Sequence, residues 1–300
     1  MIGKSYVALF VSIISVSFAA IFIVSCTAPA LSIAFYRLLF TVLLVLPFVI
    51  IHKKTRVELI NLPYKSLIIM AIIGLILAAH FALWIKSLEL TSIASSVILV
   101  TAHPILVGPI SHYLFKEKLS IINIIGITAS IFGVAVLVFG NYGFEFQGIG
   151  ALEGNILAIL GGAAAGLYIL GGRKLRKEVS VASYAFVVYS VATVVLLVLC
   201  LFFNAPIYNL SIQDYQIIFL MAVVSGILGH TLYNWSLGYV RASVASVFLL
   251  GEPLGSTLLA IAIPWINQLP SKYTVLGGII ILLGIYLTSR KQKESSFRNI

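Results

Sequence analysis

Two ionisable side chains lie within long apolar segments, and each directly precedes a proline: Glu252 before Pro253 and His103 before Pro104. A carboxylate or an imidazole far from water is costly, so such groups usually bind a substrate, an ion or a proton. A proline also removes one helical hydrogen bond, which we expect to leave a backbone carbonyl near Leu249 without a partner. Glu252 and His103 are therefore candidates for binding a polar or cationic group, or for carrying a proton, from opposite walls of one cavity. Pro104 and Pro253 are expected to kink their helices.

A structural role is the alternative interpretation of Glu252. The carboxylate would then be hydrogen-bonded to a neighbouring helix and would fix the packing at the kink. Substitution by Gln separates the two interpretations, because an amide cannot carry the proton that a carboxylate carries.

Two further polar pairs have the i, i+4 spacing that places side chains on one face of a helix. His80 and Trp84 form one pair, and His230 and Asn234 form the other. The two pairs occupy nearly equivalent positions in the two halves of the chain, so we expect them to face a common interior that holds water or substrate. Tyr168 is a further candidate for this lining. The alternative is that these side chains bridge helices by hydrogen bonds, which contribute about 1 kcal/mol in a membrane.

Two polar residues near the predicted outer ends of their segments have a second interpretation. Trp84 lies close to Lys86 and would then belong to the belt of aromatic residues at the membrane surface. Arg37 could attract a substrate carboxylate, but its long side chain is expected to extend to the lipid headgroups.

The composition indicates which elements hold these residues. Hydrophobic residues make up 61% of the 300-residue chain and charged residues 9%, and the mean hydropathy is +1.14. In soluble domains about a quarter of the residues are charged, so this chain has too few charged residues to form the polar surface of a globular protein. Apolar runs of about 20 residues, the length of a membrane-spanning helix, recur along it. We predict an all-α integral membrane protein with ten transmembrane helices, at residues 6–24, 31–51, 66–88, 92–114, 119–140, 151–172, 180–203, 215–238, 242–264 and 274–289.

The predicted helices form two repeats of five, residues 5–140 and 150–289, followed by a cytoplasmic tail at 290–300. Because five is odd, the second repeat must enter the membrane from the opposite side. Inverted repeats are typical of secondary transporters, which bind substrate between the two halves. The last helix of each repeat carries two glycines seven residues apart: Gly126 and Gly133, then Gly277 and Gly284.

The positive charges indicate the orientation. Of the 19 Lys and Arg residues, all but Arg37, Lys86 and Lys272 fall at the ends of the predicted helices that share one side of the membrane. The positive-inside rule therefore places both termini in the cytoplasm of a multi-pass protein of the plasma or inner membrane. The charges form no single basic face, which argues against nucleic-acid binding.

Several short motifs stand at characteristic places in one or the other repeat. They are Ala94-Ser95-Ser96, Pro104, the run Phe115-Lys116-Glu117-Lys118-Leu119-Ser120 with Gly126 and Gly133, Arg37 in Ala34-Phe35-Tyr36-Arg37-Leu38, and Glu252-Pro253. Together they resemble the EamA family of the drug/metabolite transporter superfamily. The resemblance implies a membrane carrier for small organic solutes. It also implies a central cavity lined by the first four helices of each repeat, with the fifth and tenth helices at the periphery.

Two positions depart from the pattern of that family. Gln268 stands in the second repeat where the first has the acid Glu117. We therefore expect that the second repeat does not share the role of this acid. The first helix reads Ser15-Val16-Ser17-Phe18 where the family often has Trp-Gly.

The sequence contains no motif of the common enzyme or pump classes. It has no HExxH pair, no Cys/His metal cluster, no Walker loop and no G-x-S-x-G elbow. We therefore expect no enzymatic activity, no cofactor and no bound metal, and we expect gradients to drive transport. An intramembrane enzyme that uses His and Glu is a remote alternative.

These observations predict a permease that works by alternating access on a small-molecule substrate. The resemblance favours export of amino acids or related small amphipathic solutes, and one central acid with a few aromatic and amide groups suits a zwitterion or an amine. Import of an organic cation, such as a quaternary amine, is the alternative. A proton or another ion coupled through Glu252 is a further expected partner.

Overall fold

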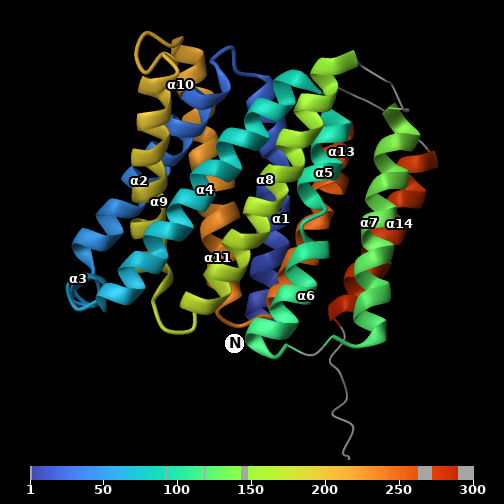
Figure 1. Ribbon diagram of the computed structural model, residues 1–300, viewed down its shortest axis with the longest axis horizontal. Helices are drawn as coiled ribbons and strands as arrows, with labels where there is room; N and C mark the ends of the chain where they lie inside the picture. Colours follow the sequence, from blue (N-terminus) through green and yellow to red (C-terminus); the bar gives the residue numbers. More distant parts are fainter. Residues whose placement is uncertain (1, 92, 118, 143–147, 263–271, 290–300) are drawn as a thin grey trace, which may run out of the picture.

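The computed structural model describes residues 2–91, 93–117, 119–142, 148–262 and 272–289. These residues form helices and no strand (Figure 1). Within them, six helices are long and apolar enough to cross a membrane. They are α1 (Ile2–Val24), α2 (Ala30–Ile51), α4 (Tyr64–Leu90), α8 (Gly148–Leu175), α9 (Val181–Phe202) and the continuous run of α10 (Ile212–Met221), η1 (Ala222–Thr231) and α11 (Leu232–Leu237). Helices suit this setting because each satisfies its own backbone hydrogen bonds without water.

The remaining apolar segments are also helical. They are α5 (Ile93–Thr101), α6 (Pro104–Phe115), α7 (Ile121–Tyr142), α12 (Ala242–Phe248), η2 (Leu249–Gly251), α13 (Glu252–Ala262) and α14 (Lys272–Ser289). A short helix that the sequence analysis did not predict, α3 (Lys53–Ile60), connects α2 to α4. Gln268 and the tail at 290–300 lie outside the described residues.

The two segments with central prolines are broken helices. Residues 92–114 and 242–264 were each predicted as one helix; the first consists of α5 and α6, and the second changes from α12 through a 3-10 turn to α13. The expectation of an unpaired carbonyl near Leu249 was wrong. The 3-10 turn lets the backbone N–H of Glu252 donate to the Leu249 carbonyl, so tightening the chain replaces the bond that Pro253 removes.

A π-helical stretch interrupts the segment of α10 and α11. Residues 222–231 form η1, and the hydroxyl of Thr231 donates to the Gly226 carbonyl at 3.0 Å. A π-helix bonds residues five apart and therefore turns the following side chains relative to an α-helix. Such stretches occur mostly at functional sites.

Side chains cap several of these helices. The Ser180 hydroxyl accepts a hydrogen bond from the Ser183 N–H at the start of α9, and Ser211 does the same with Asp214 at the start of α10. At the start of α7, Ser120 Oγ accepts from the Asn123 N–H. Such caps satisfy backbone donors that the first turn of a helix leaves free.

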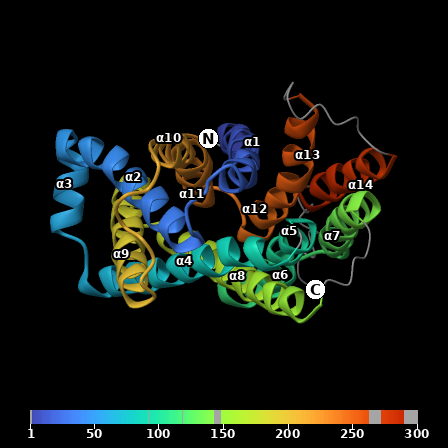
Figure 2. The same cartoon turned by 90° about the horizontal axis from the view of Figure 1, so that it is seen from above.

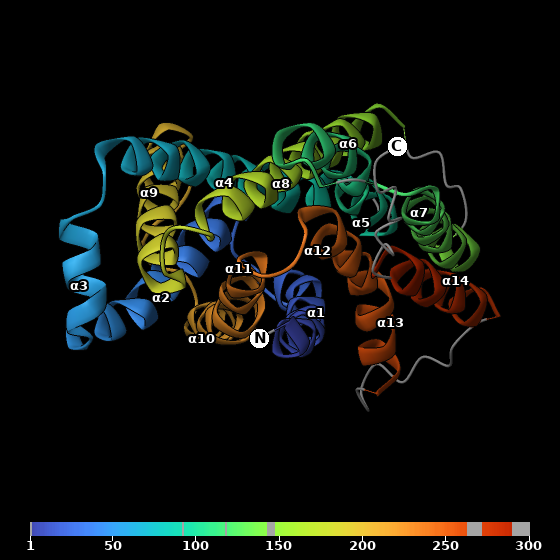
Figure 3. The same cartoon turned by 90° about the horizontal axis from the view of Figure 1, so that it is seen from below.

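Helices α7 and α14 pack together at one edge of the molecule, and α3 and α9 lie toward the opposite edge (Figures 2 and 3). The glycines seven residues apart form the contact between α7 and α14. Gly126 lies against Gly284, and Gly133 lies against Gly277, so the two helices run antiparallel. A Cβ atom on Gly133 would meet the Ile281 nitrogen at 2.8 Å.

Candidate functional site

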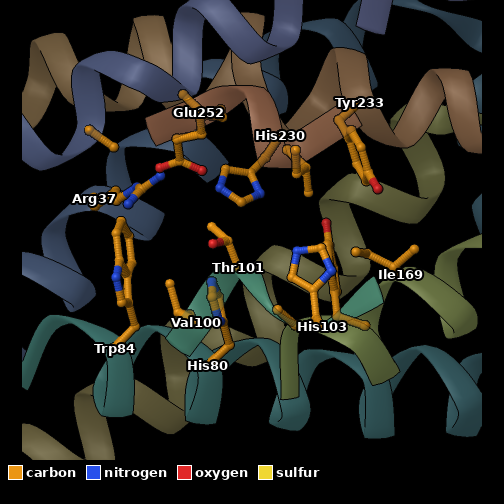
Figure 4. Close-up of a pocket in the computed structure, with 15 residues that line it drawn as sticks. Arg37, His80, Trp84, Val100, Thr101, His103, Ile169, His230, Tyr233 and Glu252 are labelled. Atoms are coloured by element: carbon orange, nitrogen blue, oxygen red, sulfur yellow. The ribbon is translucent and has the colours of Figure 1, made fainter. Parts of the chain in front are cut away.

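A cavity lies in the centre of the bundle (Figure 4). The lining residues come from α1, α2, α4, α5, α8, η1, α11, η2, α13 and the turn before α6: Val16, Ala19, Arg37, His80, Trp84, Val100, Thr101, His103, Ala165, Tyr168, Ile169, His230, Tyr233, Leu249 and Glu252. Apolar walls with a few polar groups are typical of sites that hold amphipathic ligands.

The cavity gathers all the candidate residues of the sequence analysis except Asn234. Glu252 and His103 lie on opposite sides of it (Figure 4). Their roles in binding stay predictions, because the geometry alone assigns none. Of the residues described in α7, α9 and α14, none lines the cavity. The resemblance implied a lining contribution from the helix at 180–203, but this helix, α9, lies one layer farther out.

Arg37 was expected to extend to the lipid headgroups, and this expectation was wrong. Its side chain is 1% exposed, and the guanidinium lies 4.5 Å from the centre of the Phe81 ring. The residue belongs to the inward face of α2, which also includes the buried Ala34, Leu38 and Thr41. The Nη1 and Nη2 atoms of Arg37 are buried and have no hydrogen-bond partner.

Trp84 is also buried, which contradicts its placement in an aromatic belt. The side chain is 5% exposed and stacks parallel to the His80 ring at 5.9 Å, so the i, i+4 pair shares one face of α4 as predicted. The backbone of Trp84 packs against Gly161 of α8, where there is no side chain to keep the helices apart. The Nε1 donor of Trp84 has no partner.

His80 has a defined hydrogen bond. Its Nδ1 atom lies 2.9 Å from the carbonyl oxygen of Gly161. A carbonyl accepts only, so Nδ1 carries the hydrogen, and the Nε2 atom of the neutral ring is left as an acceptor. His103, in contrast, has a buried Nδ1 atom without a partner.

Glu252 is placed by its contacts with α1. Its backbone carbonyl accepts from Ser17 Oγ at 3.3 Å, and Ser256, one turn further on, donates to the Ser17 carbonyl at 2.8 Å. The carboxylate is directed into the cavity beside Arg37 and His230 (Figure 4). The arrangement brings the acid and the arginine to one side of the same space, although they are far apart in sequence.

Asn234 lies behind the cavity wall and supports it. Its Nδ2 atom donates to the hydroxyl oxygens of Tyr168 and Tyr189, the second at 3.0 Å, and Tyr189 in turn lies 3.3 Å from the Thr231 hydroxyl. The i, i+4 pattern did not hold here, because the Asn234 amide bonds to the hydroxyls of Tyr168 and Tyr189 instead of facing the cavity. Tyr233, rather than Asn234, follows His230 on the lining.

The sequence analysis missed several residues of this region. Tyr233 and Thr101 line the cavity, and Tyr189 and Tyr184 of α9 are buried behind it. A tyrosine within an apolar helix is a weak signal, because its ring packs well in a core and its hydroxyl finds partners on other helices.

A buried charged cluster lies at the end of the molecule that holds the N-terminus (Figure 1). Arg173 Nε donates to Glu117 Oε1 at 2.8 Å, and the backbone N–H of Ala242, at the start of α12, donates to Glu117 Oε2 at 3.0 Å. Arg173 Nη1 also donates to the Leu237 carbonyl at 2.8 Å. Nearby, burial lowers the pKa of Arg176, whose Nε donates to a backbone carbonyl of α11. The cluster ties α6 and α8 to the connection between α11 and α12.

Within the described residues, no group of three or more His, Cys, Asp or Glu side chains is arranged to hold a metal ion. The polar groups that line the cavity are hydrogen-bond donors, imidazole rings and one carboxylate, next to aromatic rings.

Comparisons with known proteins give consistent results. The sequence pattern of the EamA-like transporter family matches residues 1–139 and again residues 152–290. The chain is 24% identical over 230 residues to the uncharacterized transporter YyaM of Bacillus subtilis (strain 168), covering 75% of this chain and 72% of that protein. It is 23% identical over 266 residues to an uncharacterized transporter of Archaeoglobus fulgidus, covering 88% and 89%. A solved crystal structure shares the fold with a TM-score of 0.78 and 18% identity, and the match covers 96% of each chain.

Proposed function

Because the chain belongs to the EamA-like transporter family, we propose that it is a secondary transporter that moves small organic metabolites across the cell membrane by alternating access. The observation that carries the proposal is the central cavity, which combines an unpaired arginine edge, a carboxylate and aromatic rings. Transporters bind their substrates in sites of this kind, between two halves and next to broken helices.

A bundle of ten spans in two inverted repeats, residues 5–140 and 150–289, is part of this proposal. Besides the six long helices, the other four spans would be α5 with α6, α7, α12 with η2 and α13, and α14. The packing supports the symmetry. Helix α4 packs on α8 as η1 packs on α1, α6 packs on α8 as α13 packs on α1, and α7 packs on α14. Each of these contacts has its counterpart when the two halves are exchanged.

The proposed orientation places both termini in the cytoplasm. The start of α1, helix α3, the end of α6 and the connections after α8 and α11 lie at one end of the bundle (Figure 1). These parts carry Lys4, Lys53, Lys54 and Arg56, Lys116, Arg173 and Lys174, and Arg241. Short loops rich in Lys and Arg stay in the cytoplasm, and this distribution supports the orientation.

Alternating access requires the cavity to open on each side in turn. In this orientation the ion pair of Glu117 and Arg173 connects the two repeats at the cytoplasmic end, so it would break when the cavity opens to the cytoplasm. The outer end has no acid at the equivalent position, because the second repeat has Gln268 there. The two ends would therefore differ in how firmly they close.

For the substrate, we favour amino acids or related amphipathic solutes, with export as the direction. A zwitterion matches a cavity that offers both Arg37 and Glu252. An organic cation, the alternative, matches it less well, because Arg37 repels a positive charge in a medium of low polarity. Glu252 is also the group that would carry a coupled proton.

The experiment is a thermal-stability screen of the purified protein in detergent against amino acids, amines, sugars and nucleosides. A ligand at 100 times its dissociation constant stabilises the folded state by about 2.7 kcal/mol, which shifts the unfolding curve clearly. A class that stabilises is then tested for counterflow in proteoliposomes. Saturable counterflow supports a carrier, conduction far above carrier rates indicates a channel, and turnover of a lipid or peptide would indicate an enzyme instead.

A further inference from the structure

We propose that Arg37 binds a carboxylate of the substrate, so that the carrier selects carboxylate-bearing solutes and rejects the corresponding amines and esters. This inference rests on the proposed function, because it assigns the substrate class of the same cavity. It starts from an unusual feature, a buried guanidinium with both of its terminal nitrogens unpaired. Arginine keeps its charge in proteins, so this group cannot avoid the cost of burial by losing a proton.

The surroundings of Arg37 stabilise the charge of its guanidinium but leave its terminal N–H groups without acceptors. The Phe81 ring lies 4.5 Å from the guanidinium carbon and stabilises the charge through its π-electrons. A ring offers no acceptor for the N–H groups of Nη1 and Nη2. Glu252 lies beside Arg37 at one side of the cavity (Figure 4), but their charged atoms are not within the 4.0 Å of a direct ion pair. The terminal nitrogens of the arginine are therefore available to a ligand in the cavity.

The geometry of the unpaired atoms points to a planar acceptor. The two terminal nitrogens of a guanidinium form a fork that matches the two oxygens of a carboxylate. Another unpaired group on the lining strengthens this match, because Trp84 Nε1 is a donor and Trp84 lies on the same side of the cavity as Arg37 (Figure 4). A quaternary amine has no acceptor for any of these donors.

Glu252 restricts the class further. It is the only acid among the lining residues, and it disfavours ligands with several negative charges, such as phosphate monoesters. It favours a ligand that carries an ammonium group close to its carboxylate, because Glu252 lies beside Arg37 (Figure 4). The rings of Trp84 and Tyr168 provide apolar surface for the remainder. The preferred ligand is an amphipathic amino acid with a free carboxylate.

The test uses matched probes that differ only at the carboxylate. L-leucine and L-phenylalanine are compared with their methyl esters and with isoamylamine and phenethylamine, which lack the carboxyl group. Phenyl phosphate tests for a phosphate-binding site. Dissociation constants are measured by thermal shift and by displacement of radiolabelled amino acid. We expect at least one amino acid to bind, with its amine and ester about tenfold weaker or more, the usual effect of losing a charged hydrogen-bond pair.

Three variants connect this selectivity to the residue. Arg37→Gln should lose most of the preference for the acid over the amine. Arg37→Lys should recover it only in part, because an ammonium lacks the fork. Arg56→Gln, on the exposed face of α3, is the matched control and should behave as the wild type. If the Arg37 variants do not fold, the wild-type protein still tests the inference, because equal binding of the amino acids and of their amines or esters would contradict it.

The outcomes separate this inference from the proposed function. Saturable counterflow of amines or esters as good as that of amino acids, or unchanged selectivity in Arg37→Gln, overturns the inference and leaves the transporter intact. Tight binding of phenyl phosphate overturns it as well. Absence of both binding and counterflow for every probe contradicts the two together.

Discussion

At the scale of single residues, the cavity is defined by polar atoms that its own helices leave unpaired. Arg37, Trp84, His103 and Tyr233 come from four different segments, and each presents a buried atom without a protein partner. Buried polar atoms are nearly always paired in proteins, so such a concentration at one place is unusual. It indicates a site that a ligand or water completes.

Glu252→Gln should weaken binding of an amino acid by about tenfold, because a carboxylate that pairs with an ammonium is replaced by a neutral amide. Thermal-shift titration of the purified protein measures this. Glu153→Gln is the control, since Glu153 is an exposed carboxylate on α8. Equal affinity in wild type and Glu252→Gln would assign the residue to packing at the helix break.

Asn234→Leu should destabilise the protein by about 1–2 kcal/mol, because the Tyr168 and Tyr189 hydroxyls each lose the amide that bonds to them in a buried place. Denaturant unfolding in mixed micelles measures the free energy. Asn61→Leu is the control, because Asn61 is exposed at the end of α3 and has a φ of −97°, which Leu can adopt. Unchanged stability would show that the tyrosines find other partners.

At the scale of elements, breaks in helices place the site. The cavity lies beside the turn between α5 and α6, beside the 3-10 turn before α13 and beside the π-helix η1. A regular helix would direct its side chains around the axis at a fixed period. Each irregularity changes that direction, which brings His103, Glu252 and His230 to one space.

Helices α7 and α14 show the opposite case, a regular contact that the sequence specifies locally. Gly133→Leu should destabilise the protein by about 1–3 kcal/mol, because its side chain would be forced against the backbone of α14, 2.8 Å from the Ile281 nitrogen. The melting temperature in detergent measures the effect. Phe132→Leu, next to it on the exposed face, is the control and should change little. Equal melting temperatures for both variants would mean that α14 is free to move away.

Helix α3 is fastened to the start of α9 by Glu58. Its Oε1 atom accepts from the Ser180 N–H at 2.8 Å, and its Oε2 atom accepts from the hydroxyls of Ser180 and Ser183. Partial burial raises the pKa of Glu58, but these hydrogen bonds outweigh it, and the pKa lies below its ordinary value of 4.5. The fastening is outside the spans and open to solvent.

This lowered pKa gives a pH dependence with a defined sign. The interaction stabilises the protein above about pH 4.5 and is lost as the pH falls through the lower folded-state pKa. Screening by water limits the contribution to about 0.5 kcal/mol. Glu58→Gln should therefore flatten the loss of stability between pH 5 and pH 3 slightly, measured as the melting temperature against pH in parallel with Glu153→Gln. An identical pH profile for Glu58→Gln and wild type would contradict this.

At the scale of the whole molecule, charge distinguishes the two ends of the bundle. The pair of Glu117 and Arg173 is buried at one end and ties the start of α12 to α6 and α8. Removing one partner of such a pair leaves a buried charge and costs about 3–5 kcal/mol.

Glu117→Gln and Arg173→Gln should therefore each destabilise the protein. The double variant should be destabilised by less than the sum of the two single effects, with a coupling energy above about 0.5 kcal/mol. A double-mutant cycle on the free energy of unfolding measures it. The pair of Lys86 and Glu89 on the surface of α4 is the control and should show little coupling. Additive effects for Glu117 and Arg173 would mean that the pair does not hold the two repeats together.

The proposed orientation can be tested with single cysteines in a chain with Cys26→Ser and Cys200→Ala. Tyr208→Cys, in the connection before α10, should react with a membrane-impermeant maleimide in intact cells, and Lys54→Cys on α3 should react only after the membrane is opened. Both positions are exposed, so the reaction of each cysteine depends on whether the maleimide can reach its side of the membrane. The reverse pattern would invert the orientation.

Much of this protein is determined by local sequence. The apolar runs predicted where the long helices lie, because the length and hydropathy of a span are properties of one segment. His80 and Trp84 were predicted to share one face of a helix, because an α-helix has a fixed period, and the two rings stack in the structure.

Other features were decided only by the tertiary structure. Whether Arg37 reaches the lipid surface or the interior depends on which neighbour covers its face of α2, and Phe81 of another helix supplies that cover. Asn234 lies behind the cavity wall because its amide bonds to tyrosines of two other helices, and Leu249 kept a partner because the chain tightened into a 3-10 turn. A sequence specifies polarity residue by residue, whereas the partner of a buried polar atom is fixed only when distant helices come together.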